Sequence, residues 1–155
     1  MTASMIPKRV VLDTNVCLDL FVFRDPRWIL LMNGLNEGSI KAITRDDCRQ
    51  EWLAVLNYPH LPVQTEQKEN IIQEFDRLIE VQTPPEPLAI KLPVCSDKDD
   101  QKFLEITRDT KADVLVTKDK ALLKLARKTR QLGLYEIETP EKFILRLTQF
   151  AHGVL

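Results

Sequence analysis

Four acidic residues of this sequence stand in line with apolar residues, where an ionised carboxylate is costly. Asp13 ends one apolar run and Asp119 follows another. Asp100 opens a predicted helix and Glu51 lies inside one, each on the apolar side. Carboxylates beside a core are stable when they are paired, hydrogen-bonded or bound to a metal. Because the four come from distant parts of a short chain, their placement predicts a divalent-metal site.

The charge of such a cluster determines the chemistry that it supports. Carboxylate oxygens are hard ligands that suit Mg²⁺ or Mn²⁺. Three or four carboxylates repel one another, so without a metal some of them should bind protons. With a metal, the cluster can lower the pKa of a bound water and stabilise negative charge on a phosphoryl oxygen.

Each of the four acids also has a plain structural explanation. Asp13 and Asp119 stand at strand-to-helix turns, where aspartate is a favoured cap. Asp100 lies in an acidic run at a helix start, where the helix dipole favours anions. Glu51 is too far inside its helix to be a cap, but a salt bridge to a nearby arginine would explain it. None of these explanations accounts for four acids at one sheet edge.

The acidic run before the fifth predicted helix leaves the third site residue open. The i, i+3, i+4, i+7 spacing of one helix face is followed by Asp100, Phe103, Leu104 and Thr107. This pattern favours Asp100 as the site residue and turns Asp97 and Asp99 away from the apolar stripe. Asp99 is kept as the alternate.

The elements that must position these acids alternate along the chain. Strands are predicted at 8–13, 40–44, 112–117 and 135–138, with a short edge strand within 88–95. Helices are predicted at 14–23, 25–38, 46–58, 65–81, 99–109, 119–130 and from 139 onward. Alternation with short apolar strands predicts an α/β fold with a parallel sheet and helices on both faces. Ligands of such sheets bind beyond the carboxyl ends of the strands, where Asp13 and Asp119 stand.

Length and composition are those of a globular protein. The 155 residues, 44% hydrophobic and 29% charged, predict one domain over 1–155. No apolar run is long enough for a membrane span, and residues 1–9 lack a signal-peptide pattern. Three scattered cysteines fit no zinc spacing, so we expect reduced thiols and a cytoplasmic location. His60 and His152 fall in no motif. A net charge of −1 means that a nucleic-acid partner would need a local basic patch.

Four segments carry a resemblance to a known family, the PIN-domain ribonucleases, whose fold occurs in many toxins of bacterial toxin–antitoxin pairs. Residues 10–15 resemble the family's first strand with its first acid, and residues 48–53 resemble the helix that bears the second. Residues 97–104 are similar to a D-x-D-D-x-x-F-L segment of one PIN branch, and residues 114–123 to its V-T-x-D-x-x-L-L segment. Their order and spacing make the match more specific than each motif alone.

The resemblance implies a function as well as a fold. We expect a three-layer α/β/α domain whose four to five parallel strands have the order 3-2-1-4-5. The implied activity is Mg²⁺- or Mn²⁺-dependent hydrolysis of single-stranded RNA that leaves a 5′-phosphate. Asp13, Asp100 and Asp119 would hold the metal, and Glu51 would complete its shell or orient the water. An antitoxin protein and a second copy of the chain are the expected protein partners.

Further residues are assigned to the surroundings of this site. Asn15 and Thr117 should line the same pocket as short polar residues that hold a carboxylate or water. Lys118 stands where this PIN branch commonly has glycine, so its side chain should lie beside the acids, where it could contact a phosphate or partly neutralise them.

Three other classes of protein share parts of this pattern. A haloacid-dehalogenase-type phosphatase needs a second aspartate two residues after the first, and that position is Asn15. A receiver domain needs paired acids before its phospho-accepting strand, and the sequence has none there. A catalytically silent PIN-like module that binds RNA or a partner would have lost acidic positions, and all four are present. The sequence leaves open whether the protein is a toxin or a housekeeping enzyme.

Overall fold

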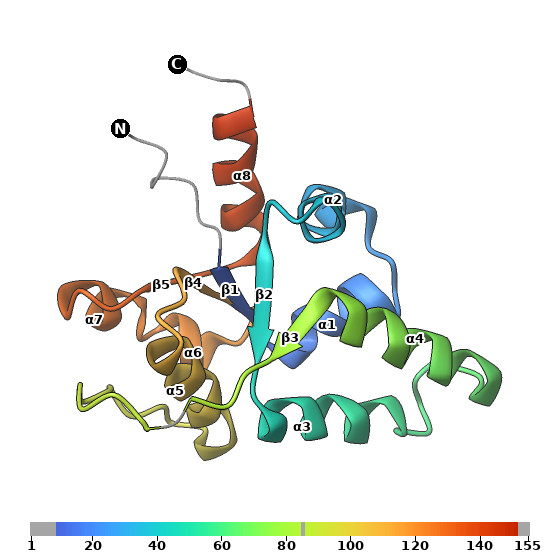
Figure 1. Cartoon of the computed structure of the whole chain (residues 1–155), viewed down its shortest axis with the longest axis horizontal. Helices are drawn as coiled ribbons and strands as arrows, with labels where there is room; N and C mark the ends of the chain where they lie inside the picture. The colour runs from blue at the N-terminus through green and yellow to red at the C-terminus, as the bar shows by residue number, and fades with distance from the viewer. Residues whose placement is uncertain (1–8, 85, 152–155) are drawn as a thin grey trace.

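A central sheet of five parallel strands organises the computed structural model, which describes residues 9–84 and 86–151 (Figure 1). Its strands are β1 (Arg9–Leu12), β2 (Lys41–Thr44), β3 (Ile79–Val81), β4 (Val114–Val116) and β5 (Glu136–Glu138). They are arranged in the order β3-β2-β1-β4-β5. The predicted α/β class and the strand order 3-2-1-4-5 are confirmed. Residue 8, where the first predicted strand begins, and His152 lie outside the described residues.

Helices cover both faces of the sheet (Figure 1). One face packs on α1 (Thr14–Phe21), α2 (Ile29–Glu37), α4 (Thr65–Leu78) and α8 (Pro140–Ala151). The other face packs on α5 (Gln101–Asp109), α6 (Lys120–Leu123) and α7 (Ala126–Gln131). Side chains of a strand alternate between faces, so Val10 and Leu12 join the first core and Val11 joins the second. Because β1 and β4 are covered on both sides, every residue of the sequence Val-Leu-Val in β4 is buried.

Helix α3 (Asp46–Leu56) lies at the carboxyl edge of the sheet (Figure 1). Its Trp52 is buried and stacks on Phe75 of α4, with 5.1 Å between the ring centroids. Phe21, at the end of α1, meets the Trp52 ring edge-on at 6.1 Å. This aromatic cluster fixes α3 against α1 and α4, and so fixes the helix that carries Glu51.

The third strand is not where the sequence pattern placed it. A helix was expected over 65–81, but α4 ends at Leu78 and the next three residues form β3. Ile79 pairs with Ala42 and Val81 with Thr44, which completes the open side of β2. The described residues of 88–95 contain no strand, so the predicted edge strand there is wrong. Leu92 and Cys95 of that segment nevertheless pack into the second core.

Two other predicted helices are interrupted close to the acids. The helix expected over 119–130 is divided into α6 and α7, with Lys124 and Leu125 between them. The helix expected over 99–109 begins with a 3₁₀ turn, Lys98–Asp100, that leads into α5. In the described part of the chain, no helix is both long and apolar enough to cross a membrane.

Candidate metal centre

Asp13 and Asp119 are placed by the two central strands. Asp13 directly follows the carboxyl end of β1, and Asp119 closely follows that of β4. The two strands are hydrogen-bonded neighbours. This is the switch point of the sheet, because β2 and β3 extend from one side of β1 while β4 and β5 extend from the other. Each residue also caps the next helix: Asp13 accepts from the Thr14 amide at 2.6 Å, and Asp119 accepts from the Ala121 amide at 2.8 Å. Each of these aspartates therefore caps a helix and also belongs to the group of acids at this edge of the sheet.

Thr117 holds these two aspartates in place. Its side chain is fully buried. The hydroxyl donates to Asp13 Oδ2 at 2.7 Å and accepts from the Asp119 backbone amide at 2.9 Å. One oxygen of Asp13 is thus fixed by its own helix and the other by the loop after β4.

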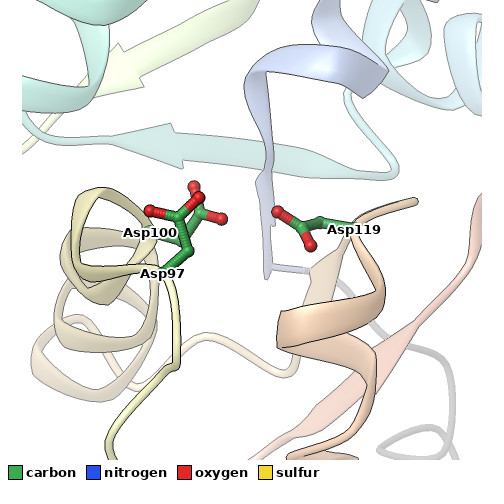
Figure 2. Close-up of side chains that lie close together, drawn as sticks. All are labelled: Asp97, Asp100 and Asp119. Carbon is green, nitrogen blue, oxygen red and sulfur yellow. The ribbon is translucent and has the colours of Figure 1, made fainter.

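Asp97 and Asp100 approach Asp119 from the turn that precedes α5, as Figure 2 shows. Each of these three residues offers a carboxylate oxygen, and the three oxygens lie within 4.8 Å of one another. The prediction that Asp97 points elsewhere is wrong, and the 3₁₀ turn explains why. A 3₁₀ turn has three residues per turn, so side chains at i and i+3 lie one above the other and Asp97 comes to the same side as Asp100. Asp99 is exposed and lies outside this triad.

Glu51 reaches the same region from α3. Its Oε2 accepts a hydrogen bond from the Thr14 hydroxyl, and its Oε1 accepts from the Lys102 ammonium at 2.7 Å. From the sequence, a salt bridge to an arginine was the structural explanation for Glu51. In the structure, Glu51 instead forms an ion pair with Lys102. Lys102, on the first turn of α5, was not singled out because nothing distinguishes it from other surface lysines in the sequence.

The four predicted acids line one pocket of about 430 Å³, here called the acidic pocket. It is also lined by two of the residues predicted around the site, Asn15 and Asp99. Thr117 supports it through Asp13 without lining it. The remaining lining residues are Thr14, Leu18, Val55, Tyr58, His60, Leu61 and Asp97. His60, which the sequence left without a role, thus stands at the pocket together with Tyr58.

Lys118 does not take the place that the sequence suggested. Its ammonium forms an ion pair with Asp19 at 2.8 Å, and Lys118 is not among the residues that line the acidic pocket. Asp19 also accepts from the Trp28 indole at 3.1 Å. The lysine therefore joins the loop after β4 to Asp19 of α1 and does not line the pocket in which it was expected to contact a phosphate or partly neutralise the acids.

Burial and mutual repulsion shift the proton affinities of the cluster. Burial raises the pKa of Asp13 to about 6, although hydrogen bonds from Thr117 and Thr14 oppose the shift and the charges of Glu51 and Asp119 add to it. Burial and the neighbouring carboxylates raise the pKa of Asp100 to about 8. The pKa of Asp119 is lowered because it shares a hydrogen bond with Asp100. Near neutral pH, Asp100 therefore keeps a proton that Asp119 has lost.

The donor atoms fit a divalent cation. Five buried side-chain polar atoms of the described residues lack a hydrogen-bond partner, and two of them, Asp100 Oδ2 and Asn15 Oδ1, belong to residues that line the acidic pocket. A buried polar oxygen without a partner costs free energy, and a bound cation would remove that cost at Asp100 while displacing its proton. All candidate ligands are oxygens, the donor type that Mg²⁺ and Mn²⁺ prefer.

Comparison with known proteins gives one informative result. A search of curated proteins found no significant match. The model of the PIN-domain family matches residues 9–121, more than half of the chain. The matched segment contains the strands β1 to β4 and all four predicted acids. PIN domains are generally metal-dependent nucleases, which agrees with an acidic triad able to hold an ion. The chain therefore belongs to the PIN-domain family.

Proposed function

We propose that this protein is a Mg²⁺- or Mn²⁺-dependent endoribonuclease that hydrolyses single-stranded RNA and leaves a 5′-phosphate. The observation that carries the proposal is the convergence of carboxylates in the acidic pocket, one of them with a buried oxygen that lacks a partner. Asp13 and Asp119 also cap helices, but Asp100 Oδ2 and the amide oxygen of Asn15 remain without a hydrogen-bond partner at this pocket.

In this proposal the acids divide between holding the ion and handling the water. Asp100 and Asp119, with Asp97 from the 3₁₀ turn, offer the three oxygens that lie within 4.8 Å of one another, and Asp13, which lines the same pocket outside this triad, completes the ligand set. A bound divalent ion would add positive charge beside the phosphate and favour loss of a proton from water. Glu51, with one oxygen on Thr14 and the other on Lys102, has a fixed orientation and accepts a hydrogen bond from the attacking water.

The bond changes of the reaction are those of a phosphodiester hydrolysis. The water oxygen bonds to phosphorus, the bond from phosphorus to the 3′ oxygen breaks, and that oxygen takes up a proton as the new 3′ hydroxyl. The second product carries the 5′-phosphate. Fixed carboxylates and a bound cation suit this step because charge develops on the phosphoryl oxygens in the transition state.

The first prediction tests this mechanism through Asp13. Replacing Asp13 with Asn should lower the rate of RNA cleavage by about a hundredfold or more, because a neutral amide no longer holds the ion against the phosphate. Single-turnover cleavage of a labelled single-stranded RNA with Mn²⁺ measures the rate, and excess chelator should abolish it. The matched control is Asp46→Asn, an exposed acid on α3 outside the acidic pocket, which should cleave at the parent rate. Cleavage by a clean Asp13→Asn preparation at the parent rate would reject the mechanism and favour a PIN-like binding module.

We also propose that the protein acts in the cytoplasm as the toxin of a toxin–antitoxin pair, with an antitoxin protein and a second copy of the chain as partners. Its family membership supports this role only at the level of the fold. Expression of the parent chain should arrest growth and expression of Asp13→Asn should not. A neighbouring reading frame that restores growth would identify the antitoxin, and normal growth with active enzyme would point to a housekeeping nuclease.

A further inference from the structure

The acidic pocket has a second kind of lining that the catalytic proposal does not use. Tyr58 and His60 both border it, and their ring centroids lie 5.7 Å apart with 39° between the ring planes. Tyr58 is 48% exposed, and His60 is also exposed. Leu18, Val55 and Leu61 complete this aromatic and apolar part of the lining. Exposed rings beside a charged pocket offer a flat apolar surface to a ligand.

The loop that carries the two rings is held by backbone hydrogen bonds and prolines. The Tyr58 amide donates to Val55 O at 3.0 Å, and the Leu61 amide donates to Tyr58 O at 3.2 Å. Pro59 stands between the two rings and Pro62 follows Leu61. Proline fixes its own φ, so the backbone that carries the rings has less conformational entropy to lose when a ligand binds.

Tyr58 closely follows the helix that carries Glu51. Glu51 and Val55 are four residues apart on one side of α3, which ends at Leu56, and Tyr58 lies two residues beyond that end. All three line the acidic pocket. A nucleotide whose phosphate lies at the acidic end of this pocket can therefore reach Tyr58 with its base.

We propose that Tyr58 and His60 form a stacking platform for a nucleobase next to the scissile phosphate, which selects single-stranded RNA; this rests on the proposed function. The acids that surround the pocket repel a phosphate backbone, and the Lys102 ammonium is already paired with Glu51. Attraction to an uncharged part of the nucleotide would therefore add affinity to the little that the protein's own charges and a bound ion provide. Every base offers a π face to an aromatic side chain, whatever its sequence. The faces of a base within a duplex are already stacked, so only a single strand can use the platform.

A double-mutant cycle tests the contact directly. A six-nucleotide RNA is compared with six versions that each lack one base, and binding is measured by fluorescence anisotropy with Ca²⁺ in place of Mn²⁺. At one position, loss of the base should weaken binding to the parent chain about tenfold. Tyr58→Ala should weaken binding of the complete RNA by a similar factor and should be insensitive to loss of that base. Tyr58→Phe should bind like the parent, because stacking does not need the hydroxyl.

Controls separate this proposal from its rivals. Phe23→Ala removes a ring that is 51% exposed but does not line the acidic pocket, so its binding should match that of the parent. His60→Phe retains a ring and should retain affinity for the complete RNA. A large loss of rate with unchanged affinity in His60→Phe would instead identify His60 as a group that transfers a proton, and would overturn its role in the platform.

The outcomes for the platform and for the nuclease activity are distinguishable. If the losses from Tyr58→Ala and from each missing base are simply additive, or if the parent binds no single-stranded RNA, the platform is refuted even when cleavage occurs. If the two losses are coupled but the parent cleaves no RNA with Mn²⁺ or Mg²⁺, the platform stands and the nuclease function fails.

Discussion

Asp100 and Asp99 are adjacent residues with different surroundings. The Asp100 side chain is buried, and its Oδ2 has no partner among the described residues. Asp99 is exposed, and its backbone amide donates to Asp97. The sequence kept both as the third acid, but only Asp100 belongs to the triad of oxygens that lie within 4.8 Å of one another.

The second prediction follows from this contrast. Asp100→Asn should reduce cleavage by about a hundredfold, because it removes a charged ligand from the triad. Asp99→Asn should change the rate by no more than a few-fold. Both variants carry the same chemical change one residue apart, so single-turnover rates at saturating Mn²⁺ compare position alone. Equal losses in the two variants would show that the acidic run acts as a whole.

The third prediction concerns Thr117, whose hydroxyl joins Asp13 to the Asp119 amide. Thr117→Val has almost the same shape but leaves both groups without this partner, which should cost about 1–3 kcal/mol of unfolding free energy. Cleavage should fall as well, because Asp13 is no longer held. Thr117→Ser keeps the hydroxyl and should retain most of both properties. Urea unfolding measures the stability of the two variants, and single-turnover assays measure their cleavage rates. A valine variant as stable and as active as the serine variant would contradict the role assigned to the Thr117 hydroxyl.

At the scale of elements, α3 joins the site to the core through two consecutive residues. Glu51 faces the acidic pocket, and Trp52 packs against Phe75 and Phe21. The position of Glu51 is therefore set by how well the indole fits the core. This arrangement explains how a small, partly exposed carboxylate can keep a fixed direction.

The fourth prediction tests this dependence. Trp52→Ala should lower the free energy of unfolding by about 3–5 kcal/mol, as expected when a large buried aromatic side chain is removed. Leu145→Ala, on the exposed side of α8, should change it by about 0.5 kcal/mol or less. Denaturant unfolding measures both. A loss below about 1 kcal/mol for Trp52→Ala would mean that α3 is not anchored through this residue.

At the scale of the whole molecule, the cluster ties stability to pH. The folded chain holds protons on Asp13 and Asp100 up to pH values of about 6 and about 8, whereas their ordinary pKa is 3.8. Between about pH 4 and about pH 8, the folded state therefore binds more protons at these two groups than the unfolded state does. The free energy of unfolding falls as pH rises through this range. The contribution of these two groups is fully present below about pH 4 and is lost by about pH 8.

The fifth prediction is an outcome of this linkage. In chelator, the melting temperature of the parent should fall between pH 5 and pH 8 more steeply than that of Asp100→Asn, which lacks the carboxyl with a pKa of about 8 and keeps that of Asp13. Added Mn²⁺ should raise the melting temperature of the parent at pH 8, with about 2.7 kcal/mol of stabilisation at a hundred times its dissociation constant. The variant should respond less. Parallel pH profiles in chelator, together with no response to metal, would show that the carboxylates are only caps.

Local sequence pattern was sufficient for the central strands and for two of the acids. A short apolar run is buried on both faces in a parallel sheet, and the residue after it falls at the carboxyl edge whatever the neighbouring strands are. Asp13 and Asp119 could therefore be assigned from β1 and β4 alone. The spacing of Glu51, three residues after Cys48 and four before Val55, likewise predicted that it lies on the apolar side of its helix.

Tertiary structure decided the features that depend on a partner remote in sequence. Ile79 to Val81 continue the helical pattern of α4, yet they form a strand because β2 offers unpaired backbone groups to them. Asp97 joins the triad because the chain tightens into a 3₁₀ turn before α5. Lys118 turns to Asp19, and Tyr58 with His60 reaches the acidic pocket, through contacts that no local spacing encodes. Side-chain periodicity records only the face that a residue presents, whereas the partner on that face is fixed by how distant segments pack.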